Sequence, residues 1–311
     1  MKPLSSNNRP GNFHGVLAAL VTPMRDDGEI ECDKLGAFAD HLIGQGVHGL
    51  IPLGSTGEYY ALTTDEREHV IRATVEAAAG RVPVIAGTNA GSTREVVASS
   101  RQAEALGCAG VMLAPPYYSL PQPEELLEHF RAVDGAIGIP IMLYNYPGRT
   151  GVDMSPDFIE QLAALENVRY IKESTGELPR MTELMRRCGD RLGVFCGCDT
   201  LSLPSLMVGA IGWVGGVVNV LPASHARLYE LAVVRKDYDA ARELFYELLP
   251  ILELMEGGGK YTQWVKAGCG LMGHPCGPPR GPLGPATQAE CLRLQEVLGQ
   301  TAEGRGRGVP A

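Results

Sequence analysis

The chain repeats one pattern eight times: a short apolar run, a turn rich in Gly or Pro, and then an amphipathic stretch with helical spacing. The apolar runs occupy residues 16–21, 49–53, 82–86, 110–114, 139–144, 168–172, 192–196 and 212–217. They are apolar throughout instead of alternating with polar residues, which is typical of parallel strands buried on both faces. We expect helices in the stretches that follow them, at 33–45, 63–79, 92–106, 122–136, 155–165, 178–188, 199–209 and 222–234.

Eight such repeats in succession favour a closed (β/α)8 TIM barrel, an α/β fold, over an open doubly wound sheet. No G-x-G-x-x-G motif follows the first strand, which lowers the case for a dinucleotide-binding fold. Three more helical stretches follow the eighth repeat, at 237–256, 259–273 and 286–298. We therefore expect a flexible N-terminal extension (1–12), a barrel (13–234), a small C-terminal helical domain (235–300) and a frayed tail (301–311).

Composition excludes several classes of partner. The net charge of −9 argues against nucleic acid, because phosphate binding needs a basic face. No apolar run approaches the ~20 residues of a membrane helix, and the first eleven residues lack the apolar segment of a secretory signal. The eight cysteines fit neither a zinc pattern nor the framework of a small disulfide scaffold. We expect a cytoplasmic protein with reduced thiols and no metal.

Lys172 ends the sixth apolar run, and only five other lysines occur in the chain. A lysine at the end of a buried strand loses hydration, which favours its neutral form. A neutral amine can attack a carbonyl group and form a Schiff base. The alternative is a lysine that reaches out of the strand end and pairs its charge with Glu173. On this segment alone, both interpretations stay open.

The ends of the other predicted strands carry further candidates, and in a (β/α)8 barrel these ends share one rim. Ser55 and Thr56 stand between glycines after the second strand, where backbone N–H groups can approach a carboxylate closely. The fifth strand ends at Tyr144, whose hydroxyl can move protons, and Arg149 follows in the next loop. A guanidinium there can hold a carboxylate by two hydrogen bonds.

Two strand ends offer weaker features. Tyr118 follows two prolines after the fourth strand and can equally be a packing aromatic. Around Val214 and Gly215 the eighth strand has small residues, which leave room beside the lysine for a ligand. Together the candidates place an amine, phenols, hydroxyls and a guanidinium on one rim, and such convergence is what an active site requires.

Three strings carry a resemblance to a known family. They are Gly54-Ser55-Thr56-Gly57-Glu58, Tyr144-Asn145-Tyr146-Pro147-Gly148-Arg149-Thr150-Gly151 and Ile171-Lys172-Glu173-Ser174-Thr175-Gly176. In this order and spacing they resemble the dihydrodipicolinate synthase / N-acetylneuraminate lyase family, over about residues 15–298. The resemblance implies a class I lyase without metal or cofactor, in which Lys172 forms a Schiff base with pyruvate.

The resemblance also implies roles for individual residues. Tyr144 would move protons, and Thr56 and Gly57 would lie with Ser55 at the pyruvate carboxylate. Ser55, Tyr144 and Tyr118 match a hydroxyl relay of the family in which Tyr118 comes from a neighbouring subunit. The implied protein is then a homo-oligomer, a dimer or tetramer, and its partners are pyruvate and a small aldehyde or 2-oxo acid.

The substrate stays open between branches of the family. Arg149 matches the position at which the synthase binds the carboxylate of aspartate semialdehyde. Ser55 is what the sialic acid lyases carry, and Tyr146 resembles 2-keto-3-deoxy sugar-acid aldolases and dehydratases. Thr64 and Arg67 stand where the synthase's lysine-feedback pocket has histidines, so we do not expect feedback by lysine. Outside the enzymes, a non-catalytic 2-oxo-acid-binding protein is a further alternative.

Overall fold

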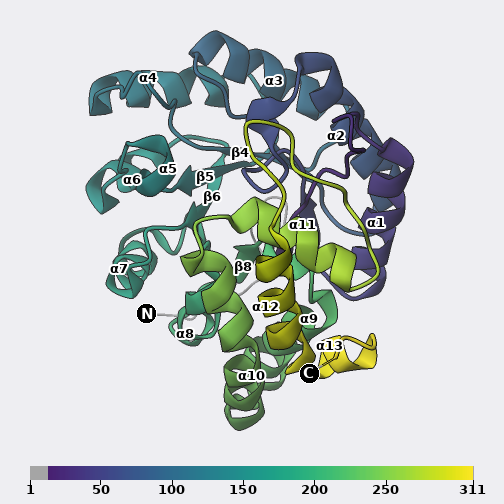
Figure 1. The fold of residues 1–311 in the computed structure, drawn as a ribbon. Helices are drawn as coiled ribbons and strands as arrows, with labels where there is room; N and C mark the ends of the chain where they lie inside the picture. The colour runs from purple at the N-terminus through teal and green to yellow at the C-terminus, as the bar shows by residue number, and fades with distance from the viewer. Residues whose placement is uncertain (1–12, 311) are drawn as a thin grey trace.

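Residues 13–310 are described by a computed structural model, in which eight parallel strands form a barrel surrounded by helices (Figure 1). The strands are β1 Gly15–Ala19, β2 Gly49–Ile51, β3 Ile85–Gly87, β4 Gly110–Leu113, β5 Ile141–Asn145, β6 Val168–Glu173, β7 Gly193–Cys196 and β8 Gly212–Gly215. The helices are α1 Cys32–Gly44, α2 Thr64–Ala78, α3 Thr93–Ala105, α4 Pro123–Asp134, α5 Pro147–Thr150, α6 Pro156–Leu162, α7 Leu178–Cys188, α8 Ser202–Met207, α9 Pro222–Tyr229, α10 Tyr238–Gly257, α11 Tyr261–Leu271, α12 Gln288–Gly299 and α13 Ala302–Gly306.

The strands pair in the order β2-β1-β8-β7-β6-β5-β4-β3, and every pair is parallel. Backbone hydrogen bonds close the remaining seam between β2 and β3. The Leu50 amide donates to the Pro83 carbonyl at 3.0 Å, and the Gly87 amide donates to the Pro52 carbonyl at 2.9 Å. The predicted TIM barrel is confirmed, and its eight strands lie where the apolar runs were expected.

The helices begin where the sequence provides caps. The Thr63 hydroxyl accepts from the Glu66 amide, and the Glu66 carboxylate accepts from the Thr63 amide, which is a capping box at the start of α2. Ser155 caps α6, and Pro156 follows at the first helical position, where a missing N–H costs nothing. The predicted helix at 199–209 is shorter than expected, since a 3-10 turn precedes α8.

Apolar side chains fill the barrel interior up to the level of the site. Phe13 stacks on Tyr170 at a ring-centroid distance of 4.7 Å, and Phe195 packs edge-on against Tyr170. The same interior cluster contains Met142 and Val214, which are fully buried. The barrel is therefore a packed core and not a pore, so a ligand can enter only beyond these layers, at one end.

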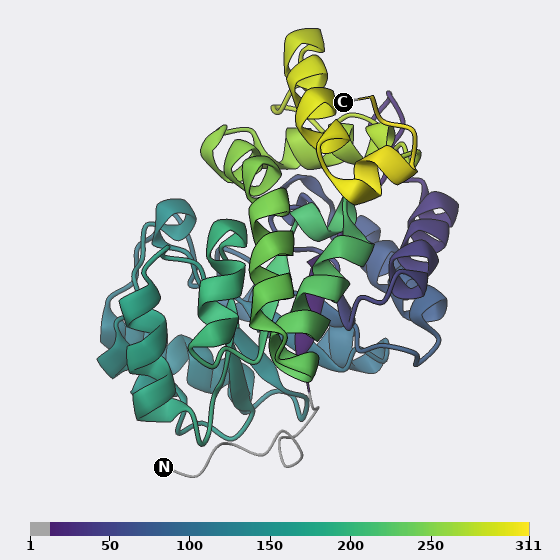
Figure 2. The same cartoon turned by 90° about the horizontal axis from the view of Figure 1, so that it is seen from below.

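The C-terminal helices α11 and α12 lie over one end of the barrel, in front of the strands in Figure 1 and toward the top of Figure 2, whereas α10 runs along the side of the barrel beside α8 and α9. All three were expected from the sequence, with ends that differ by one or two residues. A π-helical turn, Glu230–Arg235, separates α9 from α10. The division into a barrel and a helical domain at residue 235 stays a prediction.

The chain beyond α12 differs from the predicted frayed tail at 301–311. Thr301 is buried, and its hydroxyl accepts a hydrogen bond from the Gly304 amide at the start of α13. Val309 is also buried, with 6% of its surface exposed. A cap and an apolar anchor therefore hold this segment against the fold. The predicted N-terminal extension, 1–12, lies outside the described residues.

Gly87 allows β2 and β3 to close the barrel, because a Cβ there would stand 2.1 Å from the Leu53 carbonyl oxygen. We expect Gly87→Ala to lower the free energy of unfolding by about 1–3 kcal/mol or more, since backbone must move to admit the methyl group. Urea unfolding measures this. Gly91→Ala is the control, because a Cβ at Gly91 meets nothing within 4 Å. Equal stability of the two variants would contradict the tight seam.

Candidate active site

Lys172 lies inside the barrel mouth with only 7% of its surface exposed. It is the fifth residue of β6, and its side chain lines a cavity of about 450 Å³. Its amine makes no hydrogen bond or ion pair with any residue in the described part of the chain. A buried amine that faces a cavity and is not held by a carboxylate is available to a ligand.

Glu173 does not pair with Lys172, because neighbouring residues of a strand point to opposite faces. The Glu173 carboxylate is buried outside the barrel, where it accepts from the Thr175 amide at 2.7 Å and the Asn145 side-chain amide at 3.1 Å. Burial raises the pKa of this carboxyl. The alternative interpretation of Lys172, as a surface lysine paired with Glu173, is wrong.

Tyr144 is the direct neighbour of Lys172 across the pairing of β5 with β6. The Lys172 amine lies 4.4 Å from the centroid of the Tyr144 ring. Tyr144 is buried and borders both the main cavity and a second one of about 200 Å³, which also contacts Ser55, Tyr146 and Arg149. The predicted amine and phenol are thus together, on adjacent strands.

The loop after β2 brings Ser55 and Thr56 to the cavity, as predicted. Its ends are fixed by Leu53 and Glu58, which both have left-handed backbone conformations with φ near 60°. The Glu58 carboxylate is fully buried and forms an ion pair with Lys266 of α11 at 2.7 Å. The ion pair with α11 therefore holds the loop in one conformation.

Gly57 lies in close backbone packing beside the cavity, and its contact with substrate stays a prediction. It does not border the main cavity, and a Cβ there would lie 2.8 Å from the Leu20 carbonyl oxygen. Its own carbonyl accepts from the Thr22 hydroxyl at 2.7 Å. Gly57 lets the loop pack closely on the segment that follows β1. Gly215 is similar, since a Cβ there would meet the Asp199 carboxylate, whereas Val214 borders the cavity as predicted.

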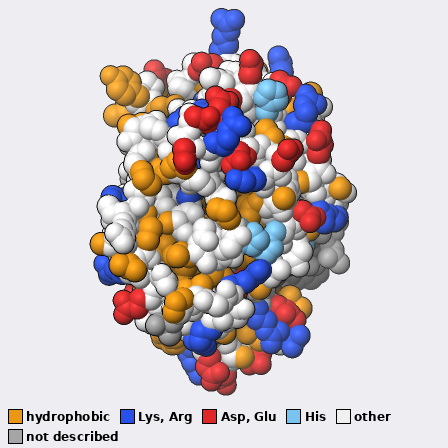
Figure 3. Space-filling model, turned by 45° about the vertical axis from the view of Figure 1, so that its right-hand side comes forward, with side chains coloured by type: hydrophobic (Ala, Val, Ile, Leu, Met, Phe, Trp, Pro, Cys, Tyr) orange, Lys and Arg blue, Asp and Glu red, His pale blue; other side chains and the backbone are white. Residues whose placement is uncertain are grey.

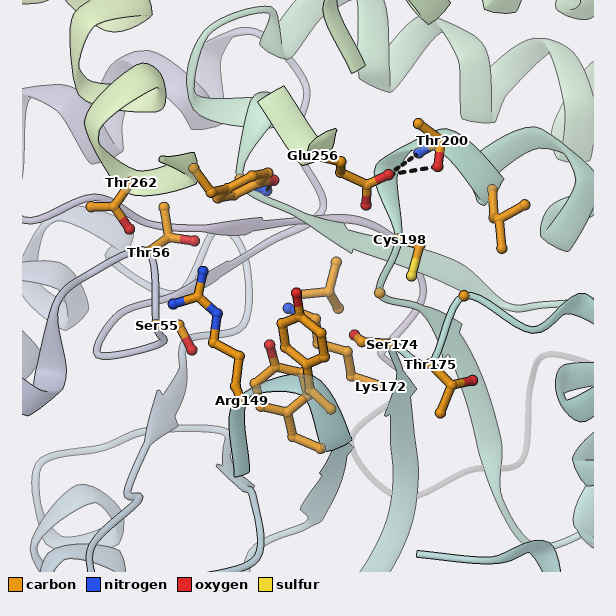
Figure 4. A pocket seen from close by; sticks show the side chains of 18 of the residues that line it. Ser55, Thr56, Arg149, Lys172, Ser174, Thr175, Cys198, Thr200, Glu256 and Thr262 are labelled. Atoms are coloured by element: carbon orange, nitrogen blue, oxygen red, sulfur yellow. Dashed lines mark hydrogen bonds between the residues drawn. The ribbon is translucent and has the colours of Figure 1, made fainter. Parts of the chain in front are cut away.

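Arg149 lies on α5, at the exposed rim of both cavities. Its guanidinium carbon is 5.9 Å from the centroid of the Tyr146 ring. Figure 4 shows Arg149 on the same side of the cavity as Ser55 and Thr56. An anionic group of a ligand can therefore meet a guanidinium and hydroxyls together.

Tyr118 is not brought to the site in this single chain. It is 97% exposed and has a left-handed backbone conformation with φ of 72°. Its neighbour Tyr117 borders the smaller cavity instead. The predicted relay of Ser55, Tyr144 and Tyr118 is therefore incomplete within one chain, and a role of Tyr118 in a second subunit stays a prediction.

The C-terminal helices form a wall of the cavity that no sequence pattern indicated. Glu256 lies near the C-terminus of α10, and Tyr261 and Thr262 begin α11, yet all three border the cavity. They lie far along the chain from any strand end. Only the tertiary packing of α10 and α11 over the barrel brings them to it.

A buried carboxyl stands behind this wall. Asp199 is 1% exposed, and its carboxyl accepts from the Tyr261 hydroxyl and, at 2.9 Å, from the Trp213 indole. Burial, together with the nearby charge of Glu256, raises the pKa of Asp199 to about 7. The Tyr261 hydroxyl in turn accepts from the Gly216 amide at 2.8 Å, so this cluster joins the 3-10 turn after β7, strand β8 with the residue that follows it, and α11.

Three further findings concern partners. Among residues 13–310, no group of three or more His, Cys, Asp or Glu side chains is placed to hold a metal ion. No helix in the same range is long and apolar enough to cross a membrane. On the face drawn in Figure 3, acidic and basic side chains are interspersed and form no continuous basic patch.

The fold and the site together are those of a TIM barrel with a buried amine in its mouth. Residues 12–301 match the family described as the dihydrodipicolinate synthetase family. The 4-hydroxy-tetrahydrodipicolinate synthase of Pelobacter propionicus is 40% identical over 289 residues, which cover 92% of this chain and 99% of the relative. The chain therefore belongs to the dihydrodipicolinate synthetase family, and the prediction of a lyase is confirmed.

Solved structures agree with this assignment. The dihydrodipicolinate synthase from Aquifex aeolicus has a TM-score of 0.89 and 34% identity, and the match covers 96% of this chain and 99% of that one. The chloride-inhibited dihydrodipicolinate synthase from Acinetobacter baumannii, complexed with pyruvate, has a TM-score of 0.88 and 31% identity, with coverage of 95% and 99%.

The raised pKa of Asp199 makes stability depend on pH. Between the unfolded pKa of 3.8 and the folded value of about 7, the folded chain holds a proton that the unfolded chain has lost. The stability that this group contributes is therefore complete below about pH 4 and declines as the pH rises to about 7. Each pKa unit between the folded and unfolded states corresponds to about 1.4 kcal/mol of unfolding free energy. The contribution of Asp199 to the free energy of unfolding is therefore several kcal/mol at most.

Asp199→Asn removes this titration, and we expect the variant to lose less stability than the parent between pH 4.5 and pH 7.5. Urea unfolding at both pH values measures the difference. Groups far from Asp199 titrate equally in both proteins and cancel. Parallel pH profiles for the two proteins would show that Asp199 titrates normally in the fold.

Proposed function

We propose that this protein is a 4-hydroxy-tetrahydrodipicolinate synthase, which condenses pyruvate with aspartate semialdehyde through a Schiff base on Lys172. The observation that carries the proposal is the buried Lys172 amine against the Tyr144 ring, in a cavity with Arg149 at its rim. The names of the relatives support the choice of substrates.

Each residue of the cavity has its own role in the proposed reaction. The Lys172 amine attacks the keto carbon of pyruvate, and loss of water leaves an imine, with protons moved by the Tyr144 hydroxyl. The imine withdraws electrons, so loss of a proton from the methyl carbon gives an enamine. That carbon then attacks the aldehyde carbon of the second substrate, and the aldehyde oxygen takes up a proton and becomes a hydroxyl. The amino group of the second substrate attacks the imine carbon, which closes a ring and releases the Lys172 amine. Ser55 and Thr56 hold the pyruvate carboxylate throughout.

We also propose that the enzyme acts as a homo-oligomer, a dimer or tetramer, in which Tyr118 completes the hydroxyl relay of a neighbouring site. The nearly full exposure of Tyr118 in the single chain supports this role.

We propose that the enzyme is located in the cytoplasm, which suits the eight cysteines, all of them free. Thr64 and Arg67 in place of histidines support the absence of feedback by lysine, and Arg67 instead donates to the Tyr59 carbonyl at 3.2 Å.

Trapping with borohydride tests the Schiff base directly. In the presence of pyruvate, we expect the peptide that contains Lys172 to gain the mass of a reduced pyruvyl group, because only an imine is reduced onto the chain. Peptide mass spectrometry measures it. Lys260, a half-exposed lysine paired with Glu290, serves as the internal control and should stay unmodified. An adduct spread equally over exposed lysines, or none on Lys172, would refute the mechanism.

The role of Arg149 separates the synthase from the alternatives. We expect Arg149→Ala to raise the KM for aspartate semialdehyde about 10- to 100-fold, since a hydrogen bond to a charged group contributes about 1.5–3 kcal/mol. The KM for pyruvate should change little. The same assays with 2-keto-3-deoxy sugar acids and N-acetylneuraminate give the comparison. Faster turnover of either of those by the parent enzyme would favour the aldolase or lyase branch instead.

A further inference from the structure

A buried ion pair lies behind the loop that carries Ser55 and Thr56. Glu58, the last residue of this loop, pairs with Lys266 of α11 at 2.7 Å, and the two side chains are 0% and 1% exposed. Neither residue borders the main cavity, and neither takes part in the proposed reaction. The pair therefore contacts no substrate, and its presence in the fold needs another explanation.

Stability alone does not account for two buried charges. Each charge loses its hydration on burial, and the attraction between them roughly offsets this cost. Apolar side chains of similar volume are often as stable or more stable in the same place. An ion pair differs from an apolar contact in its direction, because charged groups with hydrogen-bonding atoms fix the distance and orientation of their partners. The pair is therefore better suited to fix a position than to stabilise the fold.

Both oxygens of the Glu58 carboxylate are fixed. One faces the Lys266 amine, and the other accepts from the Arg280 amide at 2.8 Å. The Lys266 amine also donates to the Pro278 carbonyl at 2.9 Å, which fixes the direction of its side chain. Helix α11 and the segment that follows it thus hold one carboxylate together.

The position of Glu58 determines where the hydroxyls before it lie. Glu58 has a left-handed backbone with φ of 59°, which a residue with a side chain keeps only where its surroundings hold it. Its amide donates to the Ser55 carbonyl at 3.2 Å, so residues 55–58 form one tight turn. Thr56 lies inside this turn and is 6% exposed. A shift of the Glu58 carboxylate would therefore move the Ser55 and Thr56 side chains at the cavity (Figure 4).

We propose that Lys266 is a positioning residue for pyruvate, which acts through Glu58 to keep the Ser55 and Thr56 hydroxyls at the pyruvate carboxylate. Binding groups that are fixed before the ligand arrives lose less conformational entropy on binding. Without the Lys266 amine, pyruvate itself would have to order the loop, and pyruvate would bind more weakly. This inference rests on the proposed function, since it concerns a substrate of the same site.

Lys266→Met tests the proposal, because methionine has a similar length and no charge. We expect the pyruvate concentration that gives half-maximal borohydride trapping on Lys172 to rise about 10- to 100-fold, an effect typical of misplaced binding groups. Saturating pyruvate should still give the parent's extent of trapping, because the Lys172 amine and Tyr144 are unchanged. Peptide mass spectrometry measures both values. An unchanged half-maximal concentration in a folded variant overturns the proposal.

Lys34→Met is the matched control. Lys34 also pairs with a glutamate, Glu31, at 2.8 Å, but it does so at the surface, where its side chain is 53% exposed. This variant should leave both values unchanged. A rise equal to that of Lys266→Met would show that the loss of any paired lysine weakens pyruvate binding, and it would overturn the proposal as well.

Glu58→Gln combined with Lys266→Met separates positioning from stability. The single Lys266→Met change leaves a buried carboxylate without its partner. The double change leaves no charge, and the glutamine carbonyl can still accept from the Arg280 amide. We expect the double variant to unfold at a higher urea concentration than Lys266→Met, while trapping still requires the raised pyruvate concentration. Parent-like stability together with parent-like pyruvate binding in the double variant would overturn the proposal.

Hydrogen exchange of the parent enzyme decides the matter if neither variant folds. We expect the amides of residues 54–62 to exchange slowly before pyruvate is added, because the loop is already fixed, and pyruvate should add little protection. Protection that arises only with pyruvate would overturn the proposal. Trapping also separates the two levels of failure. An adduct on Lys172 in the parent with an unchanged half-maximal concentration in Lys266→Met defeats this inference alone, whereas no adduct in the parent defeats the proposed function.

Discussion

The backbone pairing of β5 with β6 determines which side chains face into the barrel, and the site depends on it. Tyr144 lies opposite Lys172 in this register, and Asn145 lies opposite Glu173. The first pair points inward and meets at the cavity, and the second points outward and forms a buried hydrogen bond. A slip of one residue would exchange the two faces and place a carboxylate where the amine now stands. The polar contacts of Glu173 outside the barrel therefore help to keep Lys172 inside it.

The C-terminal helices are part of the site and not an accessory to it. Lys266 of α11 is 1% exposed at its side chain and pairs with the fully buried Glu58, the last residue of the loop that brings Ser55 and Thr56 to the cavity. The Glu58 carboxylate also accepts from the Arg280 amide at 2.8 Å. Removing one member of such a buried pair costs about 3–5 kcal/mol, because the other charge is left without compensation. The same helices supply Glu256 and Tyr261, so one packing arrangement fixes the loop and completes the cavity wall.

The barrel and its reactive core could be predicted because both leave local patterns. Parallel strands buried on both faces appear as continuous apolar runs, and the rim of a TIM barrel collects strand ends, so Lys172, Tyr144 and Ser55 could be placed together. Glu256 could not be placed, because it lies on a long amphipathic helix whose contact with the barrel depends on tertiary packing. Gly57 and Gly215 do not border the main cavity, so their contact with substrate stays a prediction, and glycines near a site can serve close backbone packing as well as ligand approach. The ordered segment at 301–310 was missed because one capping threonine and one buried valine are weak signals in sequence.

The proposed chemistry requires that the Lys172 amine be reachable from a cavity in which the carboxylate of pyruvate has one preferred place. A crystal structure of the enzyme after reduction with borohydride in the presence of pyruvate tests this requirement most directly. We expect continuous density from Nζ of Lys172 to the pyruvyl group, with the carboxylate at Ser55 and Thr56 and the methyl carbon toward the open cavity. Density that leads away from these hydroxyls toward Glu256, or an unmodified Lys172 in a crystal of active enzyme, would contradict it.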